Sequence, residues 1–496
     1  MDAPQDSPSA VDAGIDTTPP PCGNGWLDEG ELCDLASADG CPTEADCDDG
    51  DACTIDRLLG GGTCVAACES APITEALSGD GCCPAGATAD DDTDCIAPTC
   101  ASPEQAHTTG AQLHSLRTII DGTGALWALW IEAGTSFDDL HASRFDGAEW
   151  GDVFRIDTTG DDYRTVEAVV DADGSLWVVY IDAGSSFDTA YAARFDGNGW
   201  ERPLRIDSTG DDYTAVQALR DGDGAIWAVY IEAGDSFDGV YASRLEGAAW
   251  STPTRIDSTG DDYTGLSAIV DVSGAPWALY VEGGDSFDGV YAARFDGSTW
   301  TTPVRVDSSG DDYGALQTVI DATGALWALY IEAGDSFDRA YASRFDGSAW
   351  ETPLSIDSSG DDYGQLRAGV DGSGALWALY TEVGGTFENV YASRFNGSAW
   401  ETPRSIDSTS DSYTELRALT DASGALWAFY IEADDSFDSA YAARWTGAAW
   451  TPVRIDSSGD DYSELSTIVD GTGALRVLYG EDGSSFDDIY DTTCGI

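Results

Sequence analysis

The sequence predicts an all-β fold, an eight-bladed β-propeller of four-stranded blades preceded by a small disulfide-rich module. From about residue 101 onward the chain repeats a unit of about 50 residues, and each unit holds four short apolar runs bounded by Gly and Asp turns. Ten of the 12 cysteines lie between Cys22 and Cys95, in a segment with few large apolar side chains. A segment with so small a core needs disulfides to fold.

The composition limits the functions that the chain can have. It has 496 residues with 91 Asp and Glu against 22 basic residues, all of them Arg, and a formal net charge of −69. Such a charge repels phosphate, so we expect no nucleic-acid partner. The lack of lysine excludes Schiff-base and P-loop chemistry. Because 42% of the residues are hydrophobic, the chain can still bury a large core.

Three segments differ in composition. Residues 1–21 are rich in Asp, Pro and Ser and predict a disordered spacer, residues 22–95 the disulfide-rich module, and residues 96–496 the propeller. No apolar run reaches about 18 residues, so we expect no transmembrane segment. The cysteines indicate an oxidising compartment. We therefore expect a secreted or outer cell-surface protein, with a lipid anchor attached through a removed N-terminal leader as one option.

Three stretches of the cysteine-rich segment carry a resemblance. They are CGNGWLDEGELCD at residues 22–34, CDDGDACTID at 47–56 and GDGCCPAGATADDDTDC at 79–95. They resemble the cysteine-rich repeats of myxobacterial surface proteins, which implies a secreted or cell-surface location and says little about a ligand. Clustered cysteines can also bind zinc, but this segment has no histidine and its spacings are irregular, so we expect disulfides.

One unit, starting at Val216, illustrates the predicted blade. Its four strands are expected at 216–220, 225–232, 240–245 and 250–256. The second run, IWAVYI, is apolar on both faces, as expected of a strand that lies between two neighbouring blades. Four short strands recurring at this spacing are typical of a propeller blade.

The ring needs a closing strand. The second-strand pattern occurs eight times, but the last unit stops after its third strand. Repeat alignment puts residues 98–106 at the fourth-strand position, so they are predicted to complete blade eight. Cys494 aligns with a third-strand aromatic and Cys100 with a fourth-strand Trp, the positions held by Phe345 and Trp350 in another unit. Residues so placed face each other across a hairpin, which predicts a Cys100–Cys494 disulfide.

The two longer loops of each unit, EAGDSFDG and DSTGDDYT in one copy, share one face of the disc and are strongly acidic. They also place aromatic rings beside carboxylates, a combination that suits a sugar. The alternative is that these rings pack between blades as core. The candidate ligand-binding residues are Tyr213 with Asp212, Phe237 with Asp238, Tyr263 with Asp262, Phe287 with Asp288, Tyr313 with Asp312, and Phe337 with Asp338.

Calcium is the one cofactor that the loops suggest, and no organic cofactor is expected. Carboxylates of each unit could supply oxygen ligands, although no loop has EF-hand spacing. The alternative is that they form Asx turns and bind water. The candidate metal ligands in one unit are Asp207, Asp211, Asp212 and Asp235. The third-strand arginines Arg194, Arg244 and Arg344 have two readings, as internal ion-pair partners or as anion ligands.

A second resemblance covers all eight units. The pattern DxxGxxWxxY, as at Asp221 to Trp227, followed by YASRFDGxxW, resembles the repeats of sialidase-type and fucose-lectin propellers. Two residues separate Asp221 from Gly224, whereas one separates the Asp and Gly of the sialidase Asp-box. This departure favours the lectin resemblance over the sialidase one.

The near-identity of the units bears on function. A propeller enzyme gathers different catalytic groups from different blades, whereas equivalent units suggest repeated binding sites. The three histidines, His107, His114 and His141, all lie in the first unit, which a diverged first blade explains. We therefore predict a multivalent, lectin-like carbohydrate-binding protein rather than an enzyme, with extracellular glycans or cationic surfaces and divalent cations as partners. A calcium-stabilised structural or protein-adhesion scaffold and a sialidase-like glycoside hydrolase are the open alternatives.

Overall fold

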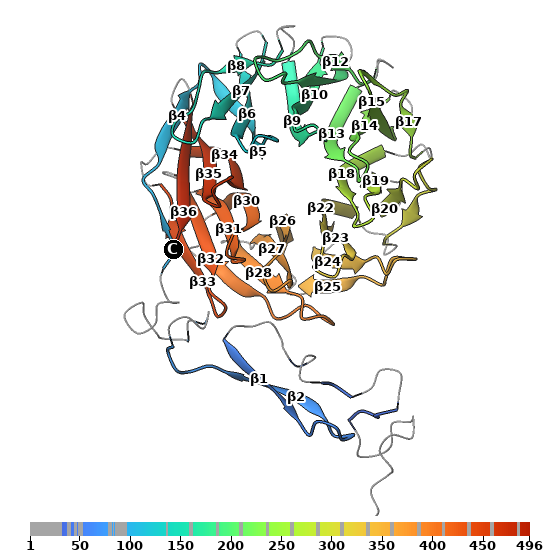
Figure 1. The fold of residues 1–496 in the computed structure, drawn as a ribbon, viewed down its shortest axis with the longest axis vertical. Helices are drawn as coiled ribbons and strands as arrows, with labels where there is room; N and C mark the ends of the chain where they lie inside the picture. The colour runs from blue at the N-terminus through green and yellow to red at the C-terminus, as the bar shows by residue number, and fades with distance from the viewer. Residues whose placement is uncertain are drawn as a thin grey trace, which may run out of the picture.

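The computed structural model is a ring of eight antiparallel sheets around a central opening, with a small β-hairpin module at the N-terminal side (Figure 1). This confirms the predicted eight-bladed, all-β propeller. The structure describes residues 32–36, 41–43, 47, 53–77, 82, 84, 97–134, 137–157, 162–184, 188–207, 212–234, 238–257, 262–283, 288–307, 312–333, 338–357, 362–383, 388–408, 412–433, 438–456, 461–483 and 487–496.

The first strand of each blade lines the central opening, and the second and third strands follow outward (Figure 1). The inner strands are β5 (Gln112–Ile120), β9 (Asp162–Val170), β13 (Asp212–Arg220), β18 (Asp262–Val270), β22 (Asp312–Ile320), β26 (Asp362–Val370), β30 (Ser412–Thr420) and β34 (Asp461–Val469). The second strands are β6 (Leu126–Ala133), β10 (Leu176–Ala183), β14 (Ile226–Ala233), β19 (Pro276–Gly283), β23 (Leu326–Ala333), β27 (Leu376–Val383), β31 (Leu426–Ala433) and β35 (Leu475–Asp482).

The third and fourth strands form the outer part of each blade. The third strands are β7 (Asp139–Phe145), β11 (Asp188–Arg194), β15 (Gly239–Glu246), β20 (Gly289–Arg294), β24 (Arg339–Arg344), β28 (Glu388–Arg394), β32 (Ser439–Trp445) and β36 (Asp488–Gly495). The fourth are β8 (Phe154–Arg155), β12 (Leu204–Arg205), β16 (Ala249–Trp250) with β17 (Thr254–Arg255), β21 (Val304–Arg305), β25 (Leu354–Asp357), β29 (Arg404–Asp407), β33 (Trp450–Arg454), and β3 (Thr99–Cys100) with β4 (Glu104–Thr108).

The closing strand lies where the repeat alignment placed it. Both β3 and β4 pair with β36, the third strand of blade eight, so the segment that precedes blade one completes the last blade. Cys100 stands opposite Cys494 in this pairing, and the two are joined by a disulfide, as predicted.

The fourth strands differ from the prediction because they are short. In blade two, Trp200 bridges Phe195, and regular pairing resumes only at Leu204. Pro203 lies in the gap, and proline has no N–H to donate to a sheet ladder. In blade three, the inner strand begins at Asp212 rather than at Val216, because Asp212 and Tyr213 also pair with β14 across a register shift.

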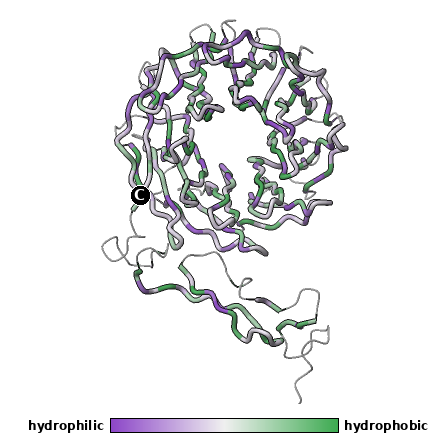
Figure 2. Tube along the Cα trace, in the orientation of Figure 1, coloured by the Kyte–Doolittle hydropathy of each residue, from purple (hydrophilic) through white to green (hydrophobic). Residues whose placement is uncertain are grey.

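The core lies between neighbouring blades. The second strands are almost wholly buried, and each cluster joins two blades, as when Trp127 of β6 packs with Val178 and Tyr180 of β10. This agrees with the predicted strand that is apolar on both faces. Figure 2 shows apolar residues within the blades and many hydrophilic residues along the rim of the ring.

The N-terminal module contains one described hairpin, β1 (Thr54–Leu59) paired with β2 (Ala67–Pro72). Disulfides join Cys33 to Cys41, Cys47 to Cys68 and Cys53 to Cys82, which confirms disulfides in this region. Within the described residues, no helix is long and apolar enough to cross a membrane.

Candidate functional site

The turn between the first and second strands is built around one aspartate. In blade three, Asp221 Oδ1 accepts hydrogen bonds from the backbone N–H groups of Asp223 and Ala225 at 3.0 and 2.8 Å. Asp221 Oδ2 accepts one from Trp227 Nε1 at 2.8 Å. Gly224, with φ of +87°, makes the turn possible because other residues rarely adopt this conformation. The DxxGxxW pattern is therefore a turn that holds the tryptophan of the second strand.

The third strand places an arginine over this tryptophan. Arg244 stands opposite Trp227 in the sheet, and its guanidinium carbon lies 5.7 Å from the centre of the indole ring. Arg244 Nη2 also lies 3.5 Å from Asp221 Oδ2, and the arginine side chain is 35% exposed. Arg194 and Arg344 lie within 4.0 Å of Glu201 and Glu351. The ion-pair interpretation of these arginines is confirmed, and part of each guanidinium still faces outward.

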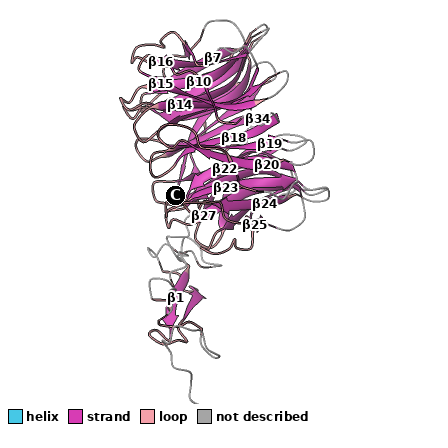
Figure 3. Cartoon of the chain, turned by 90° about the vertical axis from the view of Figure 1, so that its right-hand side faces the viewer, coloured by secondary structure: helices cyan, strands magenta, loops and turns pink. Residues whose placement is uncertain are grey.

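The hairpin between the third and fourth strands lies at the same end of the sheet. In blade four, Asp296 Oδ1 accepts hydrogen bonds from the N–H groups of Ser298 and Thr299, both at 2.8 Å. The neighbouring Phe295 ring packs 4.7 Å from the Trp227 ring of the preceding blade. The hairpin therefore packs against the preceding blade. The side view shows these described turns at one face of the disc (Figure 3).

A groove opens on this face where two blades meet. Four such grooves are present in the described part of the ring. Their volumes are about 310 Å³ between blades three and four, 490 Å³ between blades four and five, 900 Å³ between blades five and six, and 600 Å³ between blades eight and one. Each groove is lined by two arginines, one from each of its blades, and by a Gly-containing turn. A hairpin Phe and the Asp or Asn that follows it in the sequence complete the lining. We call these the inter-blade grooves. The arginine pairs are Arg244 with Arg294, Arg294 with Arg344, Arg344 with Arg394, and Arg476 with Arg144.

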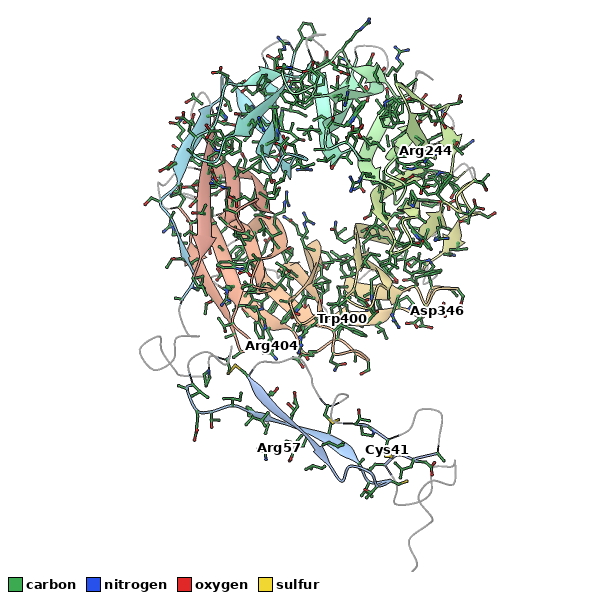
Figure 4. All side chains as sticks on the ribbon, viewed as in Figure 1. Cys41, Arg57, Arg244, Asp346, Trp400 and Arg404 are labelled. Atoms are coloured by element: carbon green, nitrogen blue, oxygen red, sulfur yellow. A yellow bond between two sulfur atoms is a disulfide. The ribbon has the colours of Figure 1, made fainter. Side chains whose placement is uncertain are left out.

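The groove between blades five and six shows what these groups can bind. Arg344 offers guanidinium donors, and its Nε has no hydrogen-bond partner among the described residues. Asn396 and Ser398 add polar groups, while Phe395 adds an apolar ring edge. In the groove between blades four and five, the backbone N–H groups of Ala349 and Ser348 hold the pKa of Asp346 below its usual value. Arg244 and Asp346 both lie in the outer half of the ring (Figure 4).

The predicted ligand tyrosines are not exposed. Tyr213, Tyr263 and Tyr313 are 0%, 2% and 7% exposed. Tyr213 packs edge-on against Tyr230, at 5.5 Å between ring centres, and the other two pack in the same way against the equivalent tyrosines. These positions correct the expected role, because a ring buried between blades cannot offer its face to a sugar. The core alternative fits the three tyrosines.

The predicted metal ligand Asp207 is also used in packing. It is 3% exposed, and its Oδ2 accepts a hydrogen bond from Tyr230 OH at 2.8 Å. Because Asp207 ends blade two and Tyr230 belongs to blade three, the bond joins neighbouring blades. An aspartate held in this way is an internal acceptor rather than a surface ligand, which corrects its expected role.

The remaining predicted carboxylates lie at the edge of the long-loop face. Asp212, Asp262 and Asp312 are exposed at the start of their inner strands, whereas Asp238, Asp288 and Asp338 are half-buried. Burial and then the nearby charge of Asp262 raise the pKa of Asp238. The predicted residues Phe237, Phe287, Phe337, Asp211 and Asp235 lie outside the described residues.

Metal binding is not visible in the described part of the chain, where no three His, Cys, Asp or Glu side chains gather as a metal site would require. Acidic pairs do recur between consecutive blades. Burial and a neighbouring carboxylate raise the pKa of Asp138 beside Asp162, as they do for Asp238 beside Asp262. Two carboxylates held close in this way repel each other and favour a counterion.

The inter-blade grooves are the part of the site that sequence reasoning missed. The sequence indicates the arginines, but not the grooves in which they meet. The signal was present in the repeat, because DxxG and FDG turns sit at the same end of an antiparallel blade and therefore share a face. What the repeat does not show is that the hairpin of one blade packs on the tryptophan of another.

No protein-family model matches the sequence, and no curated protein matches it significantly. Among solved structures, the chain is similar to an ulvan lyase of a new polysaccharide lyase family, with 12% identity and a TM-score of 0.48 over 72% of this chain and 98% of that one. A protein of unknown function from Dyadobacter fermentans has 10% identity and a TM-score of 0.42 over 81% of this chain and 98% of that one. The NanB sialidase from Streptococcus pneumoniae has 11% identity and a TM-score of 0.37 over 79% of this chain and 70% of that one. Similarities this low leave the function to be inferred from the residues of this chain.

Proposed function

We propose that the protein is a multivalent carbohydrate-binding protein that holds saccharides in its inter-blade grooves. The observation that carries this proposal is the recurrence of one set of groups, two arginines, a hairpin Phe and a hairpin Asp or Asn, in three successive grooves. Guanidinium and backbone N–H groups can donate to sugar hydroxyls, carboxylates and amides can accept from them, and the Phe edge can contact a C–H face. The disulfides favour an extracellular or cell-surface setting.

The grooves are open to solvent and each offers only a few polar groups, so each is expected to bind weakly. Avidity then depends on how many grooves a surface glycan can reach at once. Equivalent sites that are weak alone can raise the apparent affinity by about 10² or more when they are engaged together. This favours binding to clustered glycans on a surface over binding to one free saccharide.

The test is to remove the groove arginines and count the sites that remain. The triple variant R244Q/R294Q/R344Q is compared with R57Q/R202Q/R205Q, which removes the same charge from exposed positions outside the grooves. A glycan array selects the saccharide, and calorimetry and surface binding then give stoichiometry and avidity. We expect the groove variant to lower the stoichiometry and the avidity, with the dissociation constant of the remaining sites unchanged.

Two results would contradict the proposal. One is a single tight site per chain whose occupancy does not respond to the triple variant. The other is turnover of a reporter glycoside, which would favour a glycoside hydrolase with one specialised pocket.

We also infer that the long-loop face binds divalent cations weakly, because acidic pairs such as Asp238 with Asp262 recur between consecutive blades. Calcium should then raise the melting temperature more than magnesium or sodium chloride at equal ionic strength. An equal shift in all three salts would mean that the ions only screen repulsion.

A further inference from the structure

Blade eight has two opposed carboxylates at a place where the other seven blades have none. In the outer part of this blade, Asp491 of β36 stands directly opposite Glu104 of β4 (Figure 1). The other third strands have alanine at the position of Asp491. Like charges that face each other across an antiparallel pair destabilise it, so the fold alone does not favour this pair. The residues that stand opposite the alanine in blades one to seven are Phe154, Leu204, Thr254, Val304, Leu354, Arg404 and Val453.

Packing uses only part of the two carboxylates. Asp491 Oδ2 accepts hydrogen bonds from Arg476 Nη1 at 2.5 Å and from Trp150 Nε1 at 3.0 Å. Asp491 is 8% exposed, and its Oδ1 is buried with no hydrogen-bond partner among the described residues. Glu104 is exposed, and in the described part of the chain its side chain forms no ion pair. One buried oxygen and one whole carboxylate are therefore left for a ligand.

The two partners of Asp491 do not explain its presence. Arg476 Nε lies 2.9 Å from Asp470 Oδ2, so this guanidinium has a carboxylate without Asp491. In six other blades the tryptophan equivalent to Trp150 has a buried Nε1 with no hydrogen-bond partner among the described residues, so a blade packs without such an acceptor. These tryptophans are Trp200, Trp250, Trp300, Trp350, Trp400 and Trp450.

Both carboxylates line one cavity of about 440 Å³, which lies between the outer strands of blade eight and the hairpin of blade one. We call it the closing-blade cavity. The hairpin contributes Trp150, Phe145 and a third carboxylate, Glu149. Because Arg476 is the one basic residue of the lining, the cavity is negatively charged. It borders the inter-blade groove between blades eight and one, with which it shares Phe145 and Arg476, and has no lining residue in common with the other three grooves.

The electrostatics of the cavity favour a cation. Burial raises the pKa of Asp491, Arg476 and Trp150 oppose the shift, and the nearby charge of Glu104 adds to it. A positive group placed between the two carboxylates would remove their repulsion.

The groups of the cavity fit an organic cation. An ammonium group donates hydrogen bonds to carboxylates and is attracted to aromatic rings. Arg476 already lies over the Phe145 ring, at 4.0 Å from its centre, which leaves the Trp150 ring for a ligand. In the described part of the chain, no three His, Cys, Asp or Glu side chains gather here as they would for a metal ion.

We propose that the closing-blade cavity binds a primary ammonium group, held between Asp491 and Glu104 and beside the Trp150 ring. The ligand class is a small amine, either a free alkyl amine or an amino sugar, because both offer the same ammonium group. The Asp–Glu pair occurs in blade eight alone, so one ligand is bound per chain. This site does not rest on the saccharide sites proposed for the inter-blade grooves.

The test titrates the full chain with glucosamine by calorimetry, at neutral pH and constant ionic strength. N-acetylglucosamine, which has no ammonium group, should bind at least about tenfold more weakly. E104Q removes one carboxylate from an exposed position and should also weaken glucosamine binding about tenfold. The matched control E246Q removes the same charge from an exposed position of blade three and should bind as the unchanged protein does.

The double variant D491A/E104L provides an independent measurement. It gives blade eight the Ala–Leu pair that Ala192 and Leu204 form in blade two, so it should fold and should lose the glucosamine site. Ethanolamine then identifies the source of the ammonium group, since an amino-sugar site binds glucosamine more tightly than ethanolamine and a site for free amines binds the two alike.

Three results would overturn the proposal. They are equal glucosamine binding by E104Q and E246Q, binding retained by D491A/E104L, and N-acetylglucosamine binding as tight as that of glucosamine. The groove variant R244Q/R294Q/R344Q keeps Asp491 and Glu104, so a failure of the groove sites leaves these results unchanged.

Discussion

Seven of the eight blade interfaces are built alike, and the interface that closes the ring is built differently. At a regular interface, the buried tyrosine of one second strand donates to the aspartate that ends the preceding blade, as Tyr330 OH does to Asp307 Oδ2 at 2.7 Å. At the closing interface Trp130 stands in place of the tyrosine and His107 in place of the aspartate. Their rings stack at 5.2 Å between centres.

Within the described residues, other groups at the closing interface are also unique to it. Arg476 replaces the second-strand tryptophan, bonds Asp470 and Asp491, and lies 4.0 Å over the Phe145 ring of blade one. Trp150 Nε1 donates to Asp491 at 3.0 Å. Because the other units offer similar surfaces to their neighbours, an interface that only the two chain ends can make fixes where the ring closes. The closing interface has this property.

The largest expected effect comes from removing the disulfide that closes the ring. We expect C100S/C494S to lower the free energy of unfolding by up to about 5 kcal/mol, because the disulfide closes a loop of 394 residues. Chemical denaturation without reductant measures it. The double variant C33S/C41S, which opens a loop of only 8 residues, should leave propeller unfolding nearly unchanged. An equal loss in both variants would mean that the Cys100–Cys494 link does not hold the ring closed.

The second test asks whether a regular interface can replace the closing one. H107D alone should cost about 2 kcal/mol or more, because it places a carboxylate against the Trp130 ring. Adding W130Y supplies a hydroxyl donor like that of Tyr330, so the double variant should recover about 1 kcal/mol. A double-mutant cycle in denaturant measures the coupling. Strictly additive effects would show that the two positions do not form a pair.

The third test weakens a regular interface. Burial and Asp307 raise the pKa of Tyr330 far above its usual value, so its hydroxyl stays protonated and donates to the carboxylate. Y330F removes this donor with little change in volume, and we expect it to cost about 1–3 kcal/mol. The control is Y341F, which changes a half-buried ring that takes no part in the hydrogen bond to Asp307. A truncation such as F429A would not be a suitable control, because it leaves a cavity. Equal losses in Y330F and Y341F would contradict the stated role of Tyr330.

Sequence reasoning succeeded where the repeat itself carried the information. The blade number, the second strands, the closing segment and the Cys100–Cys494 pair all follow from counting and aligning units. It failed at residues whose role depends on the next blade. Asp207 and Asp212 look alike in the sequence, yet one accepts a hydrogen bond from Tyr230 in the core and the other is exposed. Strand alternation does not decide this, because both residues flank a loop.

The smallest expected effect is a pH dependence confined to the closing interface. Burial lowers the pKa of His107 below the ordinary value of 6.5, with His141 adding to the shift and the charge of Glu132 opposing it. Between the lowered pKa and about 6.5, the unfolded chain binds more protons at this residue than the folded one, so stability falls as the pH falls through that window. H107Q cannot be protonated and should lose this part of the slope, while Y330F should keep it. The measurement is the free energy of unfolding at several pH values from about 7.5 to 5.5, taken as the difference between each variant and the unchanged protein. If H107Q keeps the full slope, the groups that titrate lie elsewhere, and the neutral His107–Trp130 stack does not distinguish the closing interface from the other seven.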